Sequence, residues 1–407
     1  MNNKLRIIDI FKNMSLVLMA LYFSAVMILS YSKEYYRIAN LIFVLFAGCV
    51  FMYRMMKLEI KNSEFYYYMG SILVLSVMSY FWAINKSYAL SCTKVYFNLF
   101  LLAITIINII EEKKEIKFAL KALAFAGVAM CIYTILFYGY GNMVEMLKEG
   151  ERLGGDINQT NVFGFFCVIS FAILITYAIF DKKISYYFLV AVLAVCALTS
   201  GSRKVIISMA LIVALIVILN TNSKKVIGSV IVIMISIYLF SIASQSIYFA
   251  KIFERFDEFK GVFSENGVTD SSTALRLNML RKGLEWFSQR PVLGYGVNQF
   301  DILYEYTYGL RTYSHNFYIQ QMVSYGVAGL TLYLVMFTKI LQNIKKHIKE
   351  STEAKILFIL TILFIINGFV MEYSKEKIFF IILGIGFAFI NVYKKTYRYR
   401  RRRISKK

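Results

Sequence analysis

Residues 161–180 read NVFGFFCVISFAILITYAIF, a run without one charged side chain. A helix crosses the hydrocarbon core of a membrane with roughly 20 apolar residues, so this run predicts a transmembrane helix. It lacks the polar face that a helix of a soluble protein shows at helical spacing. Comparable apolar runs recur along the whole chain, separated by short clusters of charge. The sequence therefore predicts an all-α polytopic membrane protein.

The composition of the 407 residues agrees with this class, because 59% are hydrophobic and 17% are charged. An ordinary soluble domain has about 45–50% apolar and about 25% charged residues. The five cysteines have no spacing that suits a metal, so we interpret them as small residues facing lipid or the core. The first apolar run, near Met14, lacks a small-residue cleavage site, and we expect it to be the first membrane anchor.

We predict about 12 transmembrane helices, which form a single transmembrane bundle over residues 1–407. The predicted spans are 14–32, 37–53, 65–84, 95–110, 118–138, 161–180, 184–200, 204–221, 226–249, 317–341, 355–373 and 378–393.

Lysine and arginine gather in alternate gaps between these spans, and the positive-inside rule places such gaps in the cytoplasm. Lys12, Lys57, Lys113 and Lys182 each mark one of these gaps. Both termini are then cytoplasmic, and the basic tail at 394–407 is expected to anchor at anionic lipid. An RNA-binding tail is the lesser alternative. This distribution explains the formal net charge of +22, so nucleic acid is not expected as a partner.

The remaining gaps face outward, and two of them are long. These are the first long outer loop at 139–161 and the large outer loop at 250–316. The second is too polar to cross the bilayer and too long for a simple connector. Within it, residues 272–289 predict an amphipathic helix that lies flat on the bundle and is ended by Pro291. Its imperfect apolar stripe consists of Leu275, Leu280, Leu284 and Phe287.

The outward face contains one of the two histidines, His315, just before the tenth span; the other, His347, lies in a cytoplasmic connection. By position alone a histidine like His315 is more often a hydrogen-bonding cap or an interfacial residue than a catalytic one. It is, however, the outward side chain that we expect to act as a base near neutral pH.

Outward gaps should be poor in arginine, yet they contain Arg152, Arg203, Arg276 and Arg290. The planar guanidinium matches phosphate oxygens bidentately. Arg203 also begins a helix, whose N-terminus favours anions. These arginines predict a site for a lipid-linked pyrophosphate. The alternative is that they pair with nearby carboxylates to hold the loops together.

Several of these residues lie in motifs that resemble the O-antigen ligase and O-antigen (capsular polysaccharide) polymerase superfamily of bacterial membrane glycosyltransferases. His315-Asn316, followed after nine residues by Gly326-Val-Ala-Gly329, is similar to the ligases' histidine and Gly-x-x-Gly pattern. The segments 290–296 (RPVLGYG) and 200–203 (SGSR) are similar to further motifs of that superfamily. Arg276 and Arg152 occupy the places of two of its loop arginines.

The resemblance implies glycosyl transfer without a metal or other cofactor, from an undecaprenyl-pyrophosphate-linked oligosaccharide at the outer face of the bacterial cytoplasmic membrane. It implies His315 as the catalytic base and Arg152, Arg203, Arg276, Arg290 and Asn316 as contacts to pyrophosphate or glycan. For Gly326 and Gly329 we expect a structural role, in which small residues let helices approach closely. Besides membrane lipid, a chain-length regulator and a flippase are the partners implied.

Three functions stay open. Leu330 stands where ligases tend to have threonine, so we favour a polymerase that joins repeat units. An O-antigen ligase that transfers glycan to lipid A-core or another acceptor is the alternative. A precursor transporter or flippase is the third, although the spans show no clear internal repeat and the sole proline lies in a loop.

Overall fold

A computed structural model describes residues 2–29, 32, 34–149, 151–220 and 271–404 of the chain. Every regular element in these residues is helical, which confirms the all-α prediction. The elements in chain order are α1 Asn2–Ile28, α2 Tyr36–Lys57, α3 Phe65–Met78, η1 Ser79–Phe81, α4 Lys86–Ile109, α5 Lys113–Tyr138, α6 Tyr140–Lys148, α7 Thr160–Phe180, α8 Ser185–Thr199, α9 Arg203–Leu219, α12 Ser271–Gln289, α13 Gln299–Tyr308, α14 Phe317–Lys345, α15 Thr352–Asn367 and α16 Lys377–Ile404.

Seven helices of the described part are long and apolar enough to cross a membrane: α1, α2, α4, α5, α7, α14 and α16. Four further predicted spans correspond to the shorter helices α3, α8, α9 and α15, and the span predicted at 226–249 lies outside the described residues. A helix of 16 residues, such as α15, is about 24 Å long, against a hydrocarbon core of about 30 Å. The polytopic class is confirmed, whereas the number of 12 spans is not.

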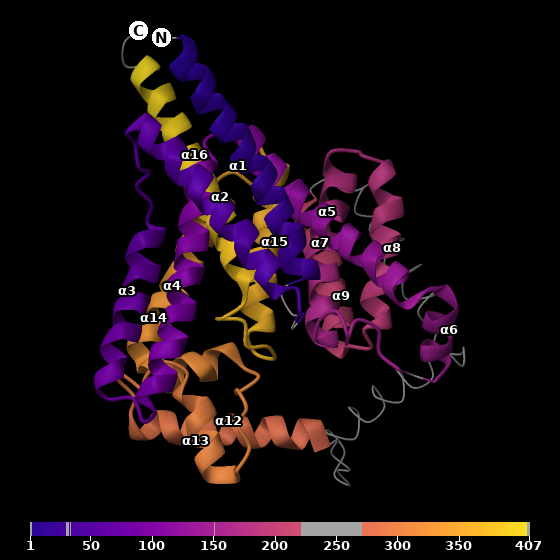
Figure 1. Cartoon of the computed structure of the whole chain (residues 1–407), viewed down its shortest axis with the longest axis vertical. Coiled ribbons are helices and arrows are strands. Elements are labelled where there is room, and N and C mark those ends of the chain that lie inside the picture. The colour runs from indigo at the N-terminus through magenta and orange to yellow at the C-terminus, as the bar shows by residue number, and fades with distance from the viewer. Residues whose placement is uncertain (1, 30–31, 33, 150, 221–270, 405–407) are drawn as a thin grey trace.

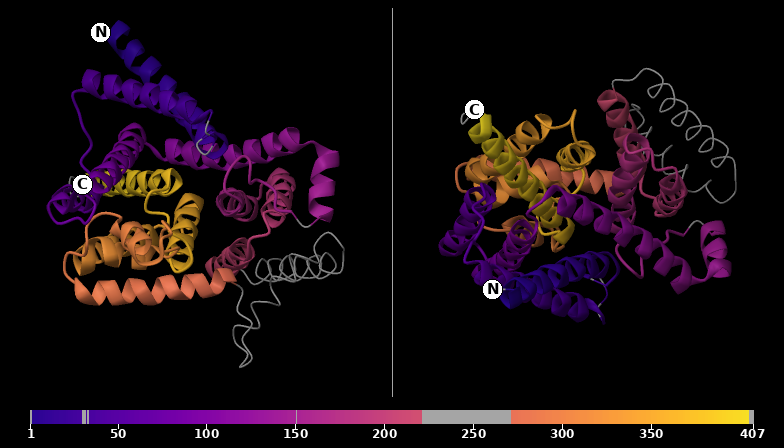
Figure 2. Two further views of the ribbon diagram at one scale, coloured as in Figure 1. Left: turned by 60° about the horizontal axis from the view of Figure 1, so that its bottom comes forward. Right: turned by 90° about the horizontal axis from the view of Figure 1, so that it is seen from above.

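The bundle has two distinct ends (Figure 1). The chain termini meet at one of them, which we call the terminal end; α12 and α13 cross the opposite end, which we call the loop end. Figure 2 shows α12 running straight along one side of the molecule. The loop end thus carries the helices of the predicted large outer loop, and α6 belongs to the first long outer loop.

Helix α12 confirms the predicted helix, but a different stripe of it is buried. The predicted residues Leu275 and Leu284 are 40% and 46% exposed, and Leu280 and Phe287 are half-buried. The buried side chains are instead Met279 and Trp286. Met279 and Trp286 lie seven residues apart, on one face of the helix. They pack with α13 and the start of α14 in a small apolar cluster that also contains Phe300. This packing fixes α12 against the loop end.

Helix α14 is broken at Gly326, where φ is 64° and ψ is −156°. The segment after α12 supplies partners on both sides of the break. Tyr295 N donates to Val323 O at 2.8 Å, and Val327 N donates to Pro291 O at 2.7 Å. A broken helix is tolerated inside a bundle where neighbouring groups satisfy the freed backbone. Segment 290–296 therefore holds the kink of α14.

The kink corrects our interpretation of the glycine pair. A Cβ on Gly326 would lie 2.3 Å from Val292 O, so glycine permits the approach of a loop and not of a helix. It also permits the positive φ that other residues rarely adopt. A Cβ on Gly329 would lie 2.3 Å from the side chain of Tyr325, one turn earlier in the same helix.

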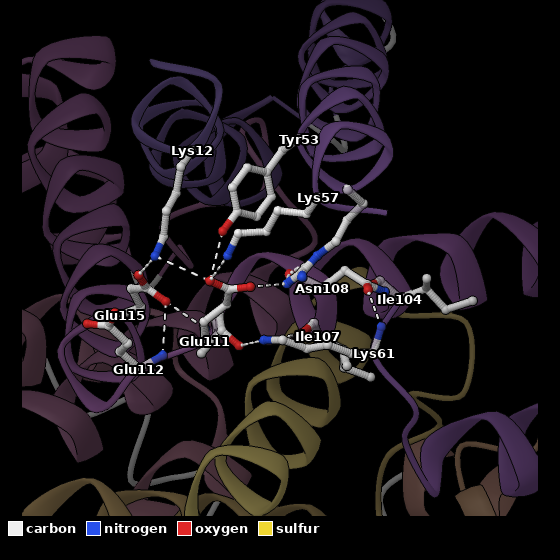
Figure 3. A network of polar contacts seen from close by, with 12 residues as sticks. Lys12, Tyr53, Lys57, Lys61, Ile104, Ile107, Asn108, Glu111, Glu112 and Glu115 are labelled. Carbon is white, nitrogen blue, oxygen red and sulfur yellow. Dashed lines mark hydrogen bonds and ion pairs between the residues drawn. The ribbon is translucent and has the colours of Figure 1, made fainter. Parts of the chain in front are cut away.

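A buried polar network joins α1, α2, α4 and α5 at the terminal end (Figure 3). Glu111 accepts from Tyr53 at 2.8 Å and from Lys57 at 2.9 Å, and Arg54 pairs with it at 2.8 Å. Lys12 pairs with Glu115 at 2.5 Å. Charge thus ties α1, α2 and α5 to the connection that follows α4 at this end.

Lys61 completes the network by capping the end of α4. Its Nζ donates to Ile110 O and Ile107 O, and its backbone N donates to Asn108 Oδ1 at 3.1 Å. A cation is favourable at the C-terminus of a helix, where carbonyl groups lack partners. Several lysines that predicted membrane orientation therefore also hold helices together.

Candidate active site

A cavity of about 170 Å³ lies where α7, α9, α14 and α16 begin. It is lined by the first turn of α7, by Lys204 of α9, by Tyr313 and His315 before α14, and by Glu372 and Glu376 before α16. Sites that enclose a drug-sized ligand measure roughly 300–1,000 Å³. The cavity is smaller, so it has room for the reacting end of a larger substrate.

His315 has a strained backbone, with a φ of 53°. The left-handed region costs a residue with a Cβ roughly 1–2 kcal/mol and persists where the surroundings impose it. Here Ser314 imposes it: Ser314 N donates to Gln320 Oε1 at 3.1 Å, and Ser314 Oγ donates to Asn316 O at 2.7 Å. The imidazole is thereby held against Tyr313, with 4.2 Å between the ring centroids.

Asp301 of α13 stabilises this turn through Gln320. Gln320 Nε2 donates to its Oδ1 at 3.0 Å, and Tyr88 of α4 donates to its Oδ2 at 2.5 Å. Lys375 Nζ lies 3.8 Å from the same carboxylate. The short helix α13, whose function the sequence did not reveal, thus connects α4, α14 and the segment before α16 around His315.

Asn316 is the N-cap of α14. Its Oδ1 accepts from Ile319 N at 3.0 Å, and its Nδ2 donates to Phe369 O at 3.0 Å. The backbone N of Phe317 donates to Gly368 O at 2.8 Å and to Met371 O at 3.0 Å. Both polar groups of Asn316 are thus used within the protein, which favours a positioning role over the predicted contact with substrate.

Cationic side chains lie near His315. Lys204 lines the cavity and donates from Nζ to Val370 O. Arg276 of α12 lies close enough to His315 to influence its pKa, and Arg152 lies close to Lys204. Arg152 is held by Ser200 O at 2.7 Å and Asn161 Oδ1 at 2.8 Å. This group of cations can bind a phosphate.

The environment of His315 keeps its ring neutral. Burial, together with the charges of Lys204 and Arg276, lowers the pKa of His315 to about 4. Among the described residues, no hydrogen bond to the imidazole is found. The ring can therefore accept a hydrogen bond from a substrate hydroxyl at pH 7. A pKa so far below 7 makes it a weak acceptor for a full proton.

Glu372 lines the same cavity, and its pKa is shifted in the opposite direction from that of His315. Burial raises its pKa to about 7, although the charge of Lys375 and hydrogen bonds with Ser374 act the other way. Ser374 N donates to its two oxygens at 3.0 and 3.1 Å. A carboxyl group with this pKa is half ionised near neutral pH, so His315 is not the sole candidate base on this face.

Glu372 and Lys204 are the site residues that the sequence analysis missed. The apolar run at 355–373 placed Glu372 inside a predicted span, whereas α15 ends at Asn367. The signal that was overlooked is the run of charges at 372–377, in a short gap that the predicted topology places on the outward side. In place of Lys204 we predicted its neighbour Arg203, which starts α9 but does not line the cavity.

Arg290 lies apart from the other predicted residues. It follows the last residue of α12, is exposed, and packs over the ring of Tyr295 at 4.6 Å. Along a helix, the 14 residues from Arg276 correspond to about 21 Å. The structure thus brings His315, Arg276 and Arg152 into one neighbourhood and leaves Arg290 outside the cavity.

Two further predictions concern the cysteines and the side chains that could bind a metal ion. The five cysteines are all buried and free, which fits the interpretation as core residues. In the described part of the chain, no group of three or more His, Cys, Asp or Glu side chains could hold a metal ion.

Residues 188–334 match a family model described as O-Antigen ligase. The matched segment runs from α8 into α14, so it includes Lys204, Arg276 and His315, whereas Arg152 and Glu372 lie outside it. No curated protein matches the chain.

Proposed function

On the match of residues 188–334 to a family model described as O-Antigen ligase, we propose that the chain belongs to the O-antigen ligase and polymerase superfamily and that it is a surface polysaccharide polymerase. It joins undecaprenyl-pyrophosphate-linked oligosaccharide repeat units at the outer face of the bacterial cytoplasmic membrane. The observation that carries this proposal is the cavity at the loop end, where a neutral histidine lies beside Lys204 and Arg276.

The reaction has simple requirements. A sugar hydroxyl of one lipid-linked glycan attacks the anomeric carbon of another, the bond from that carbon to the pyrophosphate oxygen breaks, and the pyrophosphate leaves with the electron pair. Lys204, Arg276 and Arg152 stabilise the charge that grows on the leaving group. His315 contacts the attacking hydroxyl as a catalytic residue. Protein cations supply the charge stabilisation in this scheme, so no metal takes part.

The size of the cavity fits such a substrate. It takes up the reacting sugar and the pyrophosphate, while the rest of both glycans extends away and the lipid tails stay in the membrane. Several apolar side chains of α12 and of the segment after it, among them Leu277, Val292 and Leu293, are exposed, and we expect them to contact the lipid surface.

The test is chain extension by the purified protein given undecaprenyl-pyrophosphate repeat units and nothing else. We expect longer lipid-linked glycans to form, at the same rate with and without EDTA. Products that appear only when lipid A-core is added would instead assign the chain as a ligase, the function in the description of the matched family. Loss of activity with EDTA would contradict the metal-independent scheme.

A further inference from the structure

We propose that Glu372 is a second catalytic residue of this site and is the group that accepts the proton of the attacking sugar hydroxyl. This inference rests on the proposed glycosyl transfer. It starts from position, because Glu372 and His315 line the same cavity. His315 then orients the hydroxyl by accepting a hydrogen bond, and Glu372 removes its proton.

The segments that carry the two residues are joined directly. Asn316, next to His315, donates to Phe369 O, and Phe317 N donates to Gly368 O and Met371 O. These bonds fix the turn before α14 against the connection before α16. Groups that act on one substrate atom must be held in a fixed relation to each other. The backbone of this site meets that condition.

Glu372 is also held by its own side chain. Ser374 N and Ser374 Oγ both donate to it, and Ser374 Oγ lies 2.7 Å from the hydroxyl of Tyr96 in α4. Bonds of this kind set the orientation of the carboxylate and leave lone pairs on its oxygens. The carboxylate is therefore prepared to accept one more proton or hydrogen bond from the cavity.

The charged and titratable neighbours of Glu372 come from several elements. In its own connection these are Lys375 and Glu376, and the charge of Lys375 is shared with Asp301 at 3.8 Å. Across the cavity are Lys204 and His315. The remaining neighbours are tyrosines: Tyr96 of α4, Tyr313 before α14, Tyr325 and Tyr333 of α14, and Tyr373.

The protonation behaviour agrees with this geometry. The pKa of Glu372 is raised to about 7 by burial, and that of His315 is lowered to about 4, first by burial and then by the nearby cations. A general base works best when its pKa is near the working pH. Two groups whose environments separate their pKa values often have separate roles in proton transfer. Glu372 is the better proton acceptor of the two.

The proton is fully accounted for in this scheme. As the new glycosidic bond forms, the hydroxyl proton moves to the Glu372 carboxylate, and the pyrophosphate departs with the electrons of the broken bond. Glu372 then returns the proton to water before the next cycle. Oxidants and reductants are not involved.

The experiment compares Glu372→Gln with Glu305→Gln in the purified, full-length protein. Glutamine keeps an oxygen that can accept from Ser374, so the turn is expected to remain folded, as checked by thermal unfolding. Glu305 is half-exposed on α13 and pairs with Arg311 at 3.7 Å, away from the cavity lining. We expect chain extension to fall roughly 10²–10⁴-fold in Glu372→Gln, the usual contribution of a general base, and to stay unchanged in Glu305→Gln.

The pH profile separates a base from a structural residue. Wild-type activity should rise with pH toward 7 as Glu372 ionises, and it should fall again at higher pH, because burial lowers the pKa of Lys204 to about 7 and this cation then loses its charge. The rise on the acid side should be absent from the residual activity of Glu372→Gln. In His315→Gln the activity should fall while the rise near pH 7 persists. A carboxyl band in infrared difference spectra that titrates near pH 7 and is lost in Glu372→Gln gives an independent readout.

The outcomes distinguish the two proposals. If the wild-type protein extends chains but Glu372→Gln keeps the wild-type rate and the same rise with pH, this inference is overturned and the proposed function stands. If the rise near pH 7 disappears in His315→Gln instead, the histidine is the base. A folded wild-type protein that extends no chains overturns the proposed function together with this inference.

Discussion

Buried carboxylates occur at both ends of the bundle, in contrasting surroundings. At the terminal end, burial alone would raise the pKa of Glu111, but hydrogen bonds from Lys57 and Tyr53 and the charge of Arg54 lower it to about 2. At the loop end, burial raises the pKa of Glu372 to about 7. The same side chain is therefore fully ionised in one place and poised between two states in the other.

The pKa values of Glu111 and Glu372 differ because the two carboxylates have different charged partners. Glu111 is met by cations from other helices, so its charge is compensated and the network is structural. In the cavity the cations Lys204 and Arg276 lie near His315, and they lower its pKa. Groups with pKa values shifted by burial in a cleft are typical of functional sites. Full compensation of charge thus marks the structural cluster, and partial compensation marks the candidate active site.

The largest effect is expected from Glu111→Gln at the terminal end. Loss of this charge leaves Arg54, Lys57 and Lys12 without their shared partner, and breaking a buried ion pair costs roughly 3–5 kcal/mol. A lowered melting temperature in detergent, with the specific activity of the remaining folded protein kept, checks it. Lys114→Gln is the matched control: its pair with Glu112 is exposed and should contribute less than about 1 kcal/mol.

The same network predicts a pH dependence of stability. Because the pKa of Glu111 falls from 4.5 to about 2 on folding, its contribution is present above pH 4.5 and is lost as the pH falls toward 2. In Glu111→Gln the acid branch of the stability curve should be flatter. Equal acid sensitivity in the variant and the wild type would contradict the ionic role of this residue.

A smaller effect is expected from Lys204→Gln at the loop end. It removes a charge that stabilises the leaving pyrophosphate, so chain extension should fall about 100-fold, or about 2.7 kcal/mol, with stability nearly unchanged. The pKa of His315 should rise toward its usual value, because Lys204 helps to lower it. If Arg203→Lys lost more activity than Lys204→Gln, the phosphate would be bound by Arg203, as the sequence indicated.

The smallest effect is expected from Arg290→Ala. Its side chain is exposed and packs on Tyr295, outside the cavity. Chain extension should stay within about 2-fold of wild type, whereas Arg276→Ala should lower it about 10-fold or more, because Arg276 lies near His315. Rates for the two variants under identical conditions check this. Equal losses would show that Arg290 contacts the glycan.

Much of the site could be found in the sequence because its chemistry is restricted to few residues. One histidine in a gap that the positive-inside rule predicts to face outward, and arginines where that rule disfavours them, could be found without coordinates. Glu372 was missed because we assigned it to the end of an apolar run, and its protonation state could not be predicted because it depends on burial. Asn316 was assigned to substrate because a sequence does not show whether an amide is already bound to backbone.

The sequence by itself determined that the chain is an all-helical membrane protein, because a bilayer requires long apolar helices whatever their neighbours. It also indicated the superfamily and the side of the bundle that carries His315. The tertiary structure decided which face of α12 is buried, why Gly326 is a glycine, and which cations lie near the histidine. Those features depend on contacts between residues far apart in the chain, which local patterns do not encode. Only packing could turn Glu111 into a structural anion and Glu372 into a candidate base.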